Sequence, residues 1–255
     1  MKATLGELKH KIYQSVLPSL NYRVDQEVPL ETWGSEYGEW VIPKGVMGKE
    51  SICYLAGAGE DISFDVALAE AYGSEVHIFD PTPRARAHYN ALKEAVEKGE
   101  EMALPHNSEY IYTISPTNWG YVHYHALGIW KDNETVRFYQ PSNENHVSHS
   151  ILNLQKTDSY FEAEVETLDS IMHKHGHSRI DLLKLDIEGA EYEVINDMLN
   201  KKLDVKVLCV EFDEFHNPLD GKYPVRINKV VKRLRKQGYS IVHADAYCNL
   251  TFIKR

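Results

Sequence analysis

The chain has 255 residues, of which 43% are hydrophobic and 26% charged, so it can bury a substantial core. Its formal net charge of −10 argues against nucleic acid as the main partner, because a phosphate backbone selects a basic surface. No apolar run approaches the ~20 residues that span a bilayer, and the first residues lack a signal-peptide core. The three cysteines predict buried free thiols in a reducing compartment, so we expect a cytoplasmic protein.

The N-terminal fifth of the chain lacks the alternating strand and helix pattern of the remainder. Residues 4–17 have the apolar spacing of a short amphipathic helix, which Pro18 ends. Residues 21–50 are rich in aromatic residues and glycine and predict an irregular segment. We therefore divide the chain into an N-terminal helix with an aromatic lead-in, residues 1–50, and a single α/β domain, residues 51–255.

A glycine turn follows the first predicted strand, Ile52–Ala56, and precedes a helix that begins near Asp61. Such a turn lets a ligand approach the backbone, and the helix start offers free N–H groups. The third glycine of the dinucleotide pattern GxGxxG is missing, since position 62 is Ile. The acidic residues Glu60 and Asp61 would also repel a pyrophosphate. The turn therefore favours a ligand that carries positive charge.

Asp80 ends the second predicted strand, Val76–Phe79, about 20 residues beyond the glycine turn, the spacing of an acid that binds a ribose diol. It could instead cap the predicted helix 83–98. We favour the ribose role because the glycine turn and the acid occur together.

The middle of the chain continues with alternating elements after a polar connection at 100–120. The predicted order is a third strand Tyr121–Ile129, a hairpin strand Thr135–Tyr139, a strand Phe161–Val165 and a short helix Thr167–His175. The loop 141–146, which ends at His146, contains many turn-forming residues and is the best candidate for a substrate-facing loop.

The sequence LLKLDIEGAEYEVI, residues 182–195, contains the central strand and the helix after it. Its apolar start predicts a strand buried on both faces, as parallel sheets require. Asp186 lies at the carboxyl end of this strand, where open α/β sheets bind their ligands. Glu191 falls on the apolar side of the helix, and it either caps backbone amides or serves a site.

The C-terminal part completes a mostly parallel sheet with an antiparallel edge. A buried strand, Val205–Phe212, ends among Glu211, Asp213, Glu214 and His216. A helix at 224–237 and two short strands, Tyr239–His243 and Asn249–Ile253, follow. We expect the last two strands to pair antiparallel at the sheet edge.

Two kinds of metal site are conceivable. The histidines come in two sets, His123 with His125 and His173, His175 with His177, but neither set has further Cys or His at ligand spacing, so we predict no metal there. The strand-end acids Asp186 and Glu211 or Asp213 could present oxygen ligands to magnesium, and this alternative stays open.

The order of these features, a glycine turn, an acid ending the second strand and an acid ending the fourth, is that of class I S-adenosylmethionine-dependent methyltransferases. In detail the sequence resembles the FkbM family, whose hallmark K-x-D-x-E-G-x-E matches residues 184–191. The segments TLDS (167–170), GAGEDISFD (57–65), FDPTP (79–83) and HALG (125–128) resemble further family segments. The resemblance spans about residues 35–212, and it implies a Rossmann-like α/β fold.

The resemblance also implies roles for individual residues toward S-adenosylmethionine. Five residues would line its methionine and ribose end: Gly57, Ala58, Gly59, Glu60 and Asp61. Asp80 would bind the ribose hydroxyls, Ala126 and Leu127 would border the adenine, and Asp186 would face the sulfonium or the acceptor. Family members mostly methylate hydroxyl groups, often of sugars, so the expected acceptor is a small-molecule or glycan hydroxyl.

An alcohol acceptor needs a general base, for which the sequence offers five candidates that it does not rank. They are Asp186, Glu188, Glu214, His216 and His146. We expect the acceptor pocket in segments 31–48, 105–120 and 140–160. The remaining alternatives are a magnesium-assisted sugar methyltransferase, a Rossmann-type nucleotide-binding oxidoreductase, and a cofactor-binding subunit without catalysis.

Overall fold

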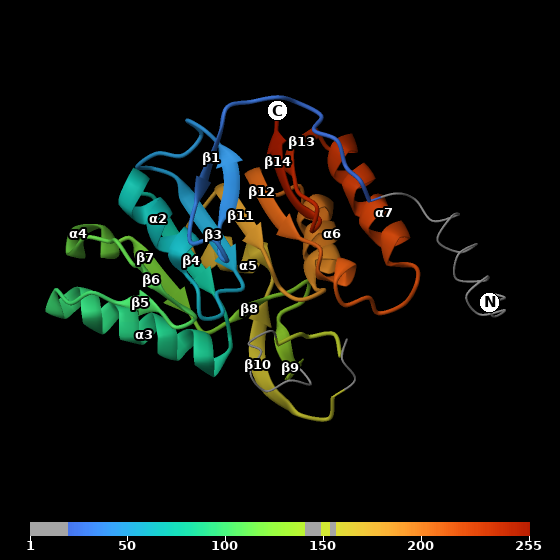
Figure 1. Ribbon diagram of the computed structural model, residues 1–255. Coiled ribbons are helices and arrows are strands. Elements are labelled where there is room, and N and C mark those ends of the chain that lie inside the picture. The colour runs from blue at the N-terminus through green and yellow to red at the C-terminus, as the bar shows by residue number, and fades with distance from the viewer. Residues whose placement is uncertain (1–19, 141–148, 154–156) are drawn as a thin grey trace, which may run out of the picture.

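The computed structural model describes residues 20–140, 149–153 and 157–255 (Figure 1). The helix predicted over 4–17 and the loop 141–146, with His146, lie outside these residues. No helix in the described ranges is long and apolar enough to cross a membrane.

A seven-stranded sheet forms the centre of the molecule, with the order β13-β14-β12-β11-β3-β4-β7. Five adjacent strands pair parallel: β7 (Val122–His125), β4 (Glu75–Phe79), β3 (Ile52–Ala56), β11 (Ile180–Leu185) and β12 (Val205–Glu211). Two antiparallel strands, β14 (Asn249–Lys254) and β13 (Tyr239–Ala244), complete the edge beside β12. The expected mixed α/β class with a large central sheet is therefore confirmed.

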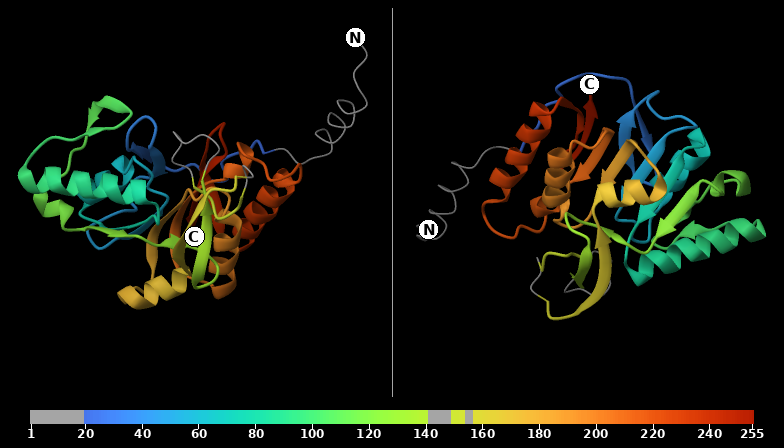
Figure 2. Two further views of the ribbon diagram at one scale, coloured as in Figure 1. Left: turned by 90° about the horizontal axis from the view of Figure 1, so that it is seen from below. Right: turned by 180° about the vertical axis from the view of Figure 1, so that it is seen from behind.

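Helices cover both faces of the sheet (Figures 1 and 2). One layer contains α2 (Ser63–Tyr72), α3 (Pro83–Lys98) and α4 (Pro116–Trp119), and the other contains α5 (Leu168–His175), α6 (Glu191–Lys201) and α7 (Tyr223–Lys236). Successive side chains of a strand point to opposite faces of the sheet, so each face has its own apolar core. On β3, Cys53 and Leu55 pack in the core with α2 and α3, whereas Tyr54 and Ala56 pack in the core with α5, α6 and α7.

The helix boundaries follow local signals in the sequence. Helix α3 begins where the Thr82 hydroxyl accepts a hydrogen bond from the Ala85 N–H, with Pro83 in the first turn, and ends at Gly99 with φ of 69°. In α5 the Thr167 hydroxyl caps the start in the same way, and Gly176 ends the helix with φ of 73°.

The third predicted strand, Tyr121–Ile129, is wrong as a single element. The chain forms β7 and then, after a tight turn closed by a 2.8 Å hydrogen bond from the Leu127 N–H to the His125 carbonyl, a separate strand β8 (Gly128–Ile129). The turn contains no proline or glycine to interrupt the pattern, since Gly128 comes after it, so the sequence alone conceals the break.

A second, three-stranded sheet begins at this break. Strand β9 (Glu134–Tyr139) pairs antiparallel with β10 (Tyr160–Glu166), and β8 pairs parallel with the other edge of β10. Residues 135–139 therefore form a strand as expected, but its partner lies about twenty residues later and not in the preceding strand. This sheet projects below the central sheet in Figure 1.

Two stretches predicted without regular structure contain short antiparallel hairpins. Strands β1 (Leu30–Trp33) and β2 (Trp40–Pro43) pair within the aromatic lead-in, and β5 (Ala103–Leu104) pairs with β6 (Asn107–Ile111) in the polar connection. A 3₁₀ turn, η1 (Asp213–Phe215), follows β12. The three cysteines are buried and free, as expected, although Cys248 precedes β14 with φ of 68°.

Candidate active site

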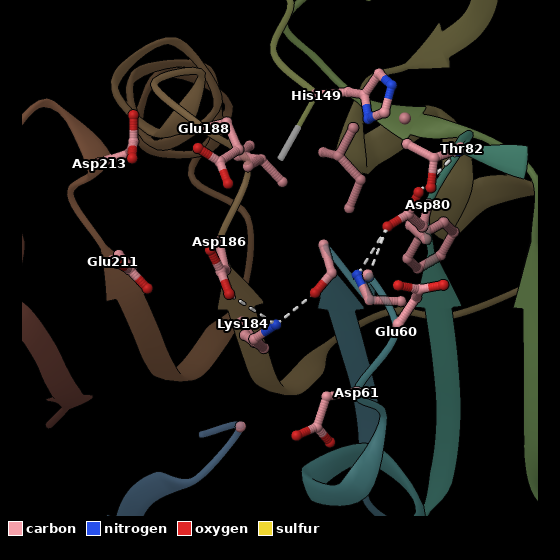
Figure 3. Close-up of a pocket in the computed structure, with 18 of the residues that line it drawn as sticks. Glu60, Asp61, Asp80, Thr82, His149, Lys184, Asp186, Glu188, Glu211 and Asp213 are labelled. Atoms are coloured by element: carbon pink, nitrogen blue, oxygen red, sulfur yellow. Dashed lines mark hydrogen bonds and ion pairs between the residues drawn. The ribbon is translucent and has the colours of Figure 1, made fainter. Parts of the chain in front are cut away.

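A pocket of about 350 Å³ opens beyond the carboxyl ends of four neighbouring parallel strands, β3, β4, β11 and β12 (Figure 3). Each strand contributes residues at or just after its end: the glycine turn 57–61, then 80–82, 186–188, and the acids Glu211 and Asp213. Residues 37–40 around β2 form another wall, and residues of the small sheet close the pocket opposite them. Open parallel sheets bind ligands at this edge.

Asp80 holds the glycine turn in place. One of its carboxylate oxygens accepts hydrogen bonds from the N–H groups of Ala58 (2.9 Å) and Gly59 (3.1 Å), and the other accepts from Thr82 (2.8 Å). The side chain is 5% exposed. A carboxylate has about four lone-pair positions, so one remains for a ligand hydroxyl. Thr82 and not Asp80 caps α3, so the cap role considered for Asp80 is wrong, and the ribose role stays a prediction.

Gly57 is required by the close approach of β3 to β11. Its φ is +84°, and a Cβ at this position would lie 1.8 Å from the carbonyl oxygen of Asp186. The N–H of Asp186 in turn donates to the Ala56 carbonyl at 3.2 Å. The glycine turn and the strand end of Asp186 are thus held against each other.

Lys184 lines the pocket, although the sequence analysis assigned it no role there. Its ammonium group donates to the Gly57 carbonyl at 2.5 Å and lies 3.3 Å from the Asp186 carboxylate (Figure 3). Burial works against its charge, but the carboxylates of Asp186, Asp65 and Glu211 outweigh that effect and raise the pKa of Lys184. A lone lysine inside a strand of apolar residues is the signal that could have identified it.

Asp65 provides a second carboxyl group near Lys184, and unlike Asp186 it is buried. Burial raises the pKa of Asp65 to about 7, while the lysine opposes the shift. Asp65 lines the pocket from the first turns of α2. Sequence reasoning missed this residue too, because its place in the pocket depends on how α2 packs on the sheet.

The two acids of the glycine turn have different partners. Glu60 forms an ion pair of 2.5 Å with Arg84 on α3, whereas Asp61 accepts hydrogen bonds from the Ser35 hydroxyl (2.5 Å) and the Ser63 N–H (2.9 Å). Both still line the pocket, together with Gly57, Ala58 and Gly59. Asp61 also joins the turn to the β1–β2 segment, where Gly38 leaves no room for a Cβ beside its carboxylate.

The residues after β11 in the hallmark pattern, 186–190, form a turn that the Glu191 side chain stabilises. One Glu191 oxygen accepts from the N–H groups of Ile187 (3.1 Å) and Gly189 (3.0 Å), and the other is buried without a partner. Burial raises the pKa of Glu191 well above its ordinary value. Glu188 and Gly189 adopt positive φ angles of 57° and 98° within this turn. Glu191 thus binds backbone amides of the turn before α6, not those of the first helical turn considered from the sequence.

Four carboxyl groups gather at one end of the pocket: Asp186, Glu188, Glu211 and Asp213 (Figure 3). Burial, followed by the charge of Asp186, raises the pKa of Glu211 to about 8. Burial also raises the pKa of Asp213, against a hydrogen bond that the Asn217 side chain donates to it. Perturbed carboxyl groups in a cleft are typical of acid–base sites.

These carboxylates do not converge as metal ligands usually do. Among the described residues, the groups of three potential ligands whose atoms lie within 4.8 Å of one another contain histidines and Glu75, not the acids of the pocket. The magnesium-assisted alternative therefore gains no geometric support from the protein side chains.

Not every predicted catalytic residue lies in the pocket. Asp186, Glu188 and His216 line it, and His216 lies 3.8 Å from Glu211. Glu214 does not line it. This residue is 1% exposed and forms a two-pronged ion pair with Arg226 of α7, so its role is structural and we withdraw it as a candidate base.

The small sheet supplies a wall of the pocket, but not through the residues Ala126 and Leu127 that were expected to border the adenine. Gly128, Ile129, Phe138, His149 and Ile151 line the pocket there, whereas Ala126 and Leu127 do not. The break between β7 and β8 explains this difference, because it turns the chain away before the wall begins. Segments 31–48 and 140–160 contribute to the pocket as expected, but residues 105–120 do not.

Comparison with known proteins agrees with this architecture. The sequence model described as "Methyltransferase FkbM domain" matches residues 55–241, which is more than half of the chain. A human protein described as "Probable methyltransferase-like protein 24" is 27% identical over 156 residues, covering 60% of this chain. The match spans 30% of the length of that human protein. No solved structure matches the chain.

Proposed function

Because the chain belongs to the FkbM family of methyltransferases, we propose that it transfers a methyl group from S-adenosylmethionine to a hydroxyl group of a sugar, a polysaccharide precursor or a related metabolite. The observation that carries this proposal is the acidic pocket at the strand ends, where the glycine turn and the hallmark turn face each other. The buried free thiols support a cytoplasmic location.

The residues present fit a cofactor that carries an ammonium and a sulfonium group. Asp61, Asp65 and Asp186 line the pocket near the glycine turn, while the one lysine among the described pocket residues, Lys184, is already engaged by Gly57 and Asp186. We propose that the glycine turn and Asp61 bind the methionine end, and that the remaining lone pair of Asp80 accepts a ribose hydroxyl. A negative wall also disfavours the pyrophosphate of a dinucleotide, which is the second candidate class.

Bound S-adenosylmethionine supplies an electrophilic methyl group on a good leaving group. The protein must therefore align the acceptor hydroxyl and accept its proton. The acids at the far end of the pocket are the candidates for this task, and the pKa of Glu211, about 8, lies near neutral pH and supports its choice. We propose Glu211, assisted by Asp186 or His216, as the general base.

Calorimetric titration of the full chain tests the cofactor assignment. S-adenosylmethionine and its demethylated product should bind, whereas NADH should not. Asp80→Asn should weaken both interactions, and Glu97→Gln, an exposed acid on α3, should leave them unchanged. Failure of the first two ligands to bind would refute the cofactor assignment, and binding of NADH would support the oxidoreductase class instead.

A further inference from the structure

A cluster of histidines lies on the sheet face that α5 covers, outside the pocket. His77 is on β4, His125 ends β7, and His175 and His177 belong to the end of α5 and the residues just after it. None of these four residues lines the pocket. The sequence presents them as separate sets and gives no reason to add His77, which comes from a third element.

Three of the histidines face one another closely. The Nδ1 atom of His77 lies 2.9 Å from the Nε2 atom of His125. The ring of His175 lies 4.8 Å from that of His77 and 4.9 Å from that of His125, measured between centroids. One nitrogen from each of the three rings fits within a group whose atoms are all within 4.8 Å of one another. Ligand nitrogens around tetrahedral zinc are separated by about 3.3 Å, so small side-chain rotations bring this group to that spacing.

Glu75 orients the central imidazole. Its carboxylate lies 2.9 Å from the Nε2 atom of His77, so it accepts the N–H of that nitrogen and leaves Nδ1 free of a proton and directed at His125. A metal-binding histidine commonly donates its other N–H to a carboxylate in this way. Glu75 lies at the start of β4, on the same face as His77.

The surroundings favour a bound cation. The carboxyl end of α5, which carries His175, adds the negative end of a helix dipole. His77 is 2% exposed whereas His175 is exposed, so an ion can enter from solvent on the His175 side.

We propose that His77, His125 and His175 bind one divalent transition-metal ion, with Zn²⁺ as the best chemical fit, and that Glu75 orients His77 as a positioning residue. Three imidazoles leave a fourth position for water. The ion joins β4, β7 and α5, three elements that are distant in sequence. It also lies next to the pocket, because the ring of Phe79, a pocket residue, stacks on His125 at 4.8 Å.

Zinc titration of the full, tag-free chain after dialysis against a chelator tests the site. We expect one Zn²⁺ per chain by calorimetry, a visible absorption band of tetrahedral Co²⁺ when cobalt is used, and a higher unfolding temperature with zinc. The variant His175→Ala should lose these three signals, and its exposed position makes misfolding a minor concern. Glu75→Gln should weaken zinc binding by about 10- to 100-fold.

The matched control is His173→Ala, an exposed histidine on the same helix that belongs to neither ligand group. It should bind zinc as the wild type does. If the histidines form only a hydrogen-bonded network, the wild type binds no stoichiometric zinc, and the proposal is overturned. Equal binding by the wild type and His175→Ala, including binding to the acids of the pocket, overturns it as well.

Discussion

The ammonium group of Lys184 lies 3.3 Å from the carboxylate of Asp186, two residues further along the chain, and also donates to the carbonyl oxygen of Gly57, just after the neighbouring strand β3. The side chain of Lys184 is 6% exposed. One buried cation therefore joins the glycine turn to the hallmark turn, the two backbone segments that face each other across the pocket. Both halves of the pocket depend on this lysine.

Replacing Lys184 by Met should lower the free energy of unfolding by about 3–5 kcal/mol at pH 7, because it leaves buried carboxylates without their cation. The loss should shrink near pH 5, where Asp65, whose pKa is about 7, carries a proton. Urea unfolding at both pH values measures the effect. Lys206→Met, at an exposed position on β12, is the control, and an equal loss in both variants would contradict the assigned role.

Two glycine substitutions separate backbone strain from steric conflict. Gly57→Ala should destabilise the protein by about 3 kcal/mol or more, because a Cβ would lie 1.8 Å from a backbone oxygen at a φ of +84°. Gly45→Ala, at φ of +77° with nothing within 4 Å, should cost only about 1–2 kcal/mol of strain. Thermal unfolding of the two variants provides the comparison, and similar losses would show that the two strands can separate.

The buried carboxyl group of Glu191 should stabilise the fold through the one oxygen that accepts hydrogen bonds. Glu191→Ala removes the acceptor of two backbone N–H groups and should cost about 2–3 kcal/mol. Glu191→Gln keeps that acceptor and should stay within about 1 kcal/mol of the wild type. Chemical denaturation measures both. A glutamine variant as unstable as the alanine variant would indicate that the negative charge, not the hydrogen bonds, holds the turn.

Glu211 should make the protein less stable as the pH rises. Its pKa rises from 4.5 to about 8 on folding, so between these values the folded chain holds a proton that the unfolded chain has lost. Stability then falls with increasing pH over this window. In Glu211→Gln this contribution is absent. The free energy of unfolding of the variant should therefore rise relative to that of the wild type between pH 5 and about pH 8. Parallel pH profiles of unfolding would show that Glu211 ionises freely in the folded protein.

The same variant tests the base assignment. Glu211→Gln should reduce kcat by about 10²- to 10⁴-fold while S-adenosylmethionine affinity stays near that of the wild type. Activity can be followed as formation of the demethylated cofactor once an acceptor is found. Glu214→Gln is not a suitable control, because its ion pair with Arg226 supports the fold. His173→Ala is suitable, since this residue is exposed and does not line the pocket.

The central sheet can be predicted from the sequence because its strands are apolar runs that end at turn-forming or acidic residues. The glycine turn after Ala56 and the acids after Phe79 and Leu185 mark strand ends, and parallel strands bring these ends to one edge. Pocket residues that immediately follow a strand, such as Asp80 and Asp186, are therefore identifiable from the sequence alone.

Residues whose position depends on tertiary packing are not identifiable in this way. Lys184 interrupts an apolar strand in the sequence, which does not show that Gly57 lies within its reach. Glu214 follows Glu211 closely along the chain, but the 3₁₀ turn rotates it toward Arg226 and away from the pocket. The break at Ala126 escapes prediction because residues that commonly form strands lie on both sides of it, so the pattern gives no signal for a change of sheet.

The break after His125 makes the small sheet an insertion between two strands of the central one. The chain leaves the central sheet after β7, builds β8, β9 and β10, and returns through α5 and β11. The wall with Gly128, Phe138 and His149 thus belongs to a module inserted at one point of the chain, while the glycine turn and the hallmark turn belong to the sheet itself. Selection can lengthen or rewrite this module without disturbing the strand ends opposite it, so related enzymes can diversify the molecules they accept while inheriting one unchanged frame.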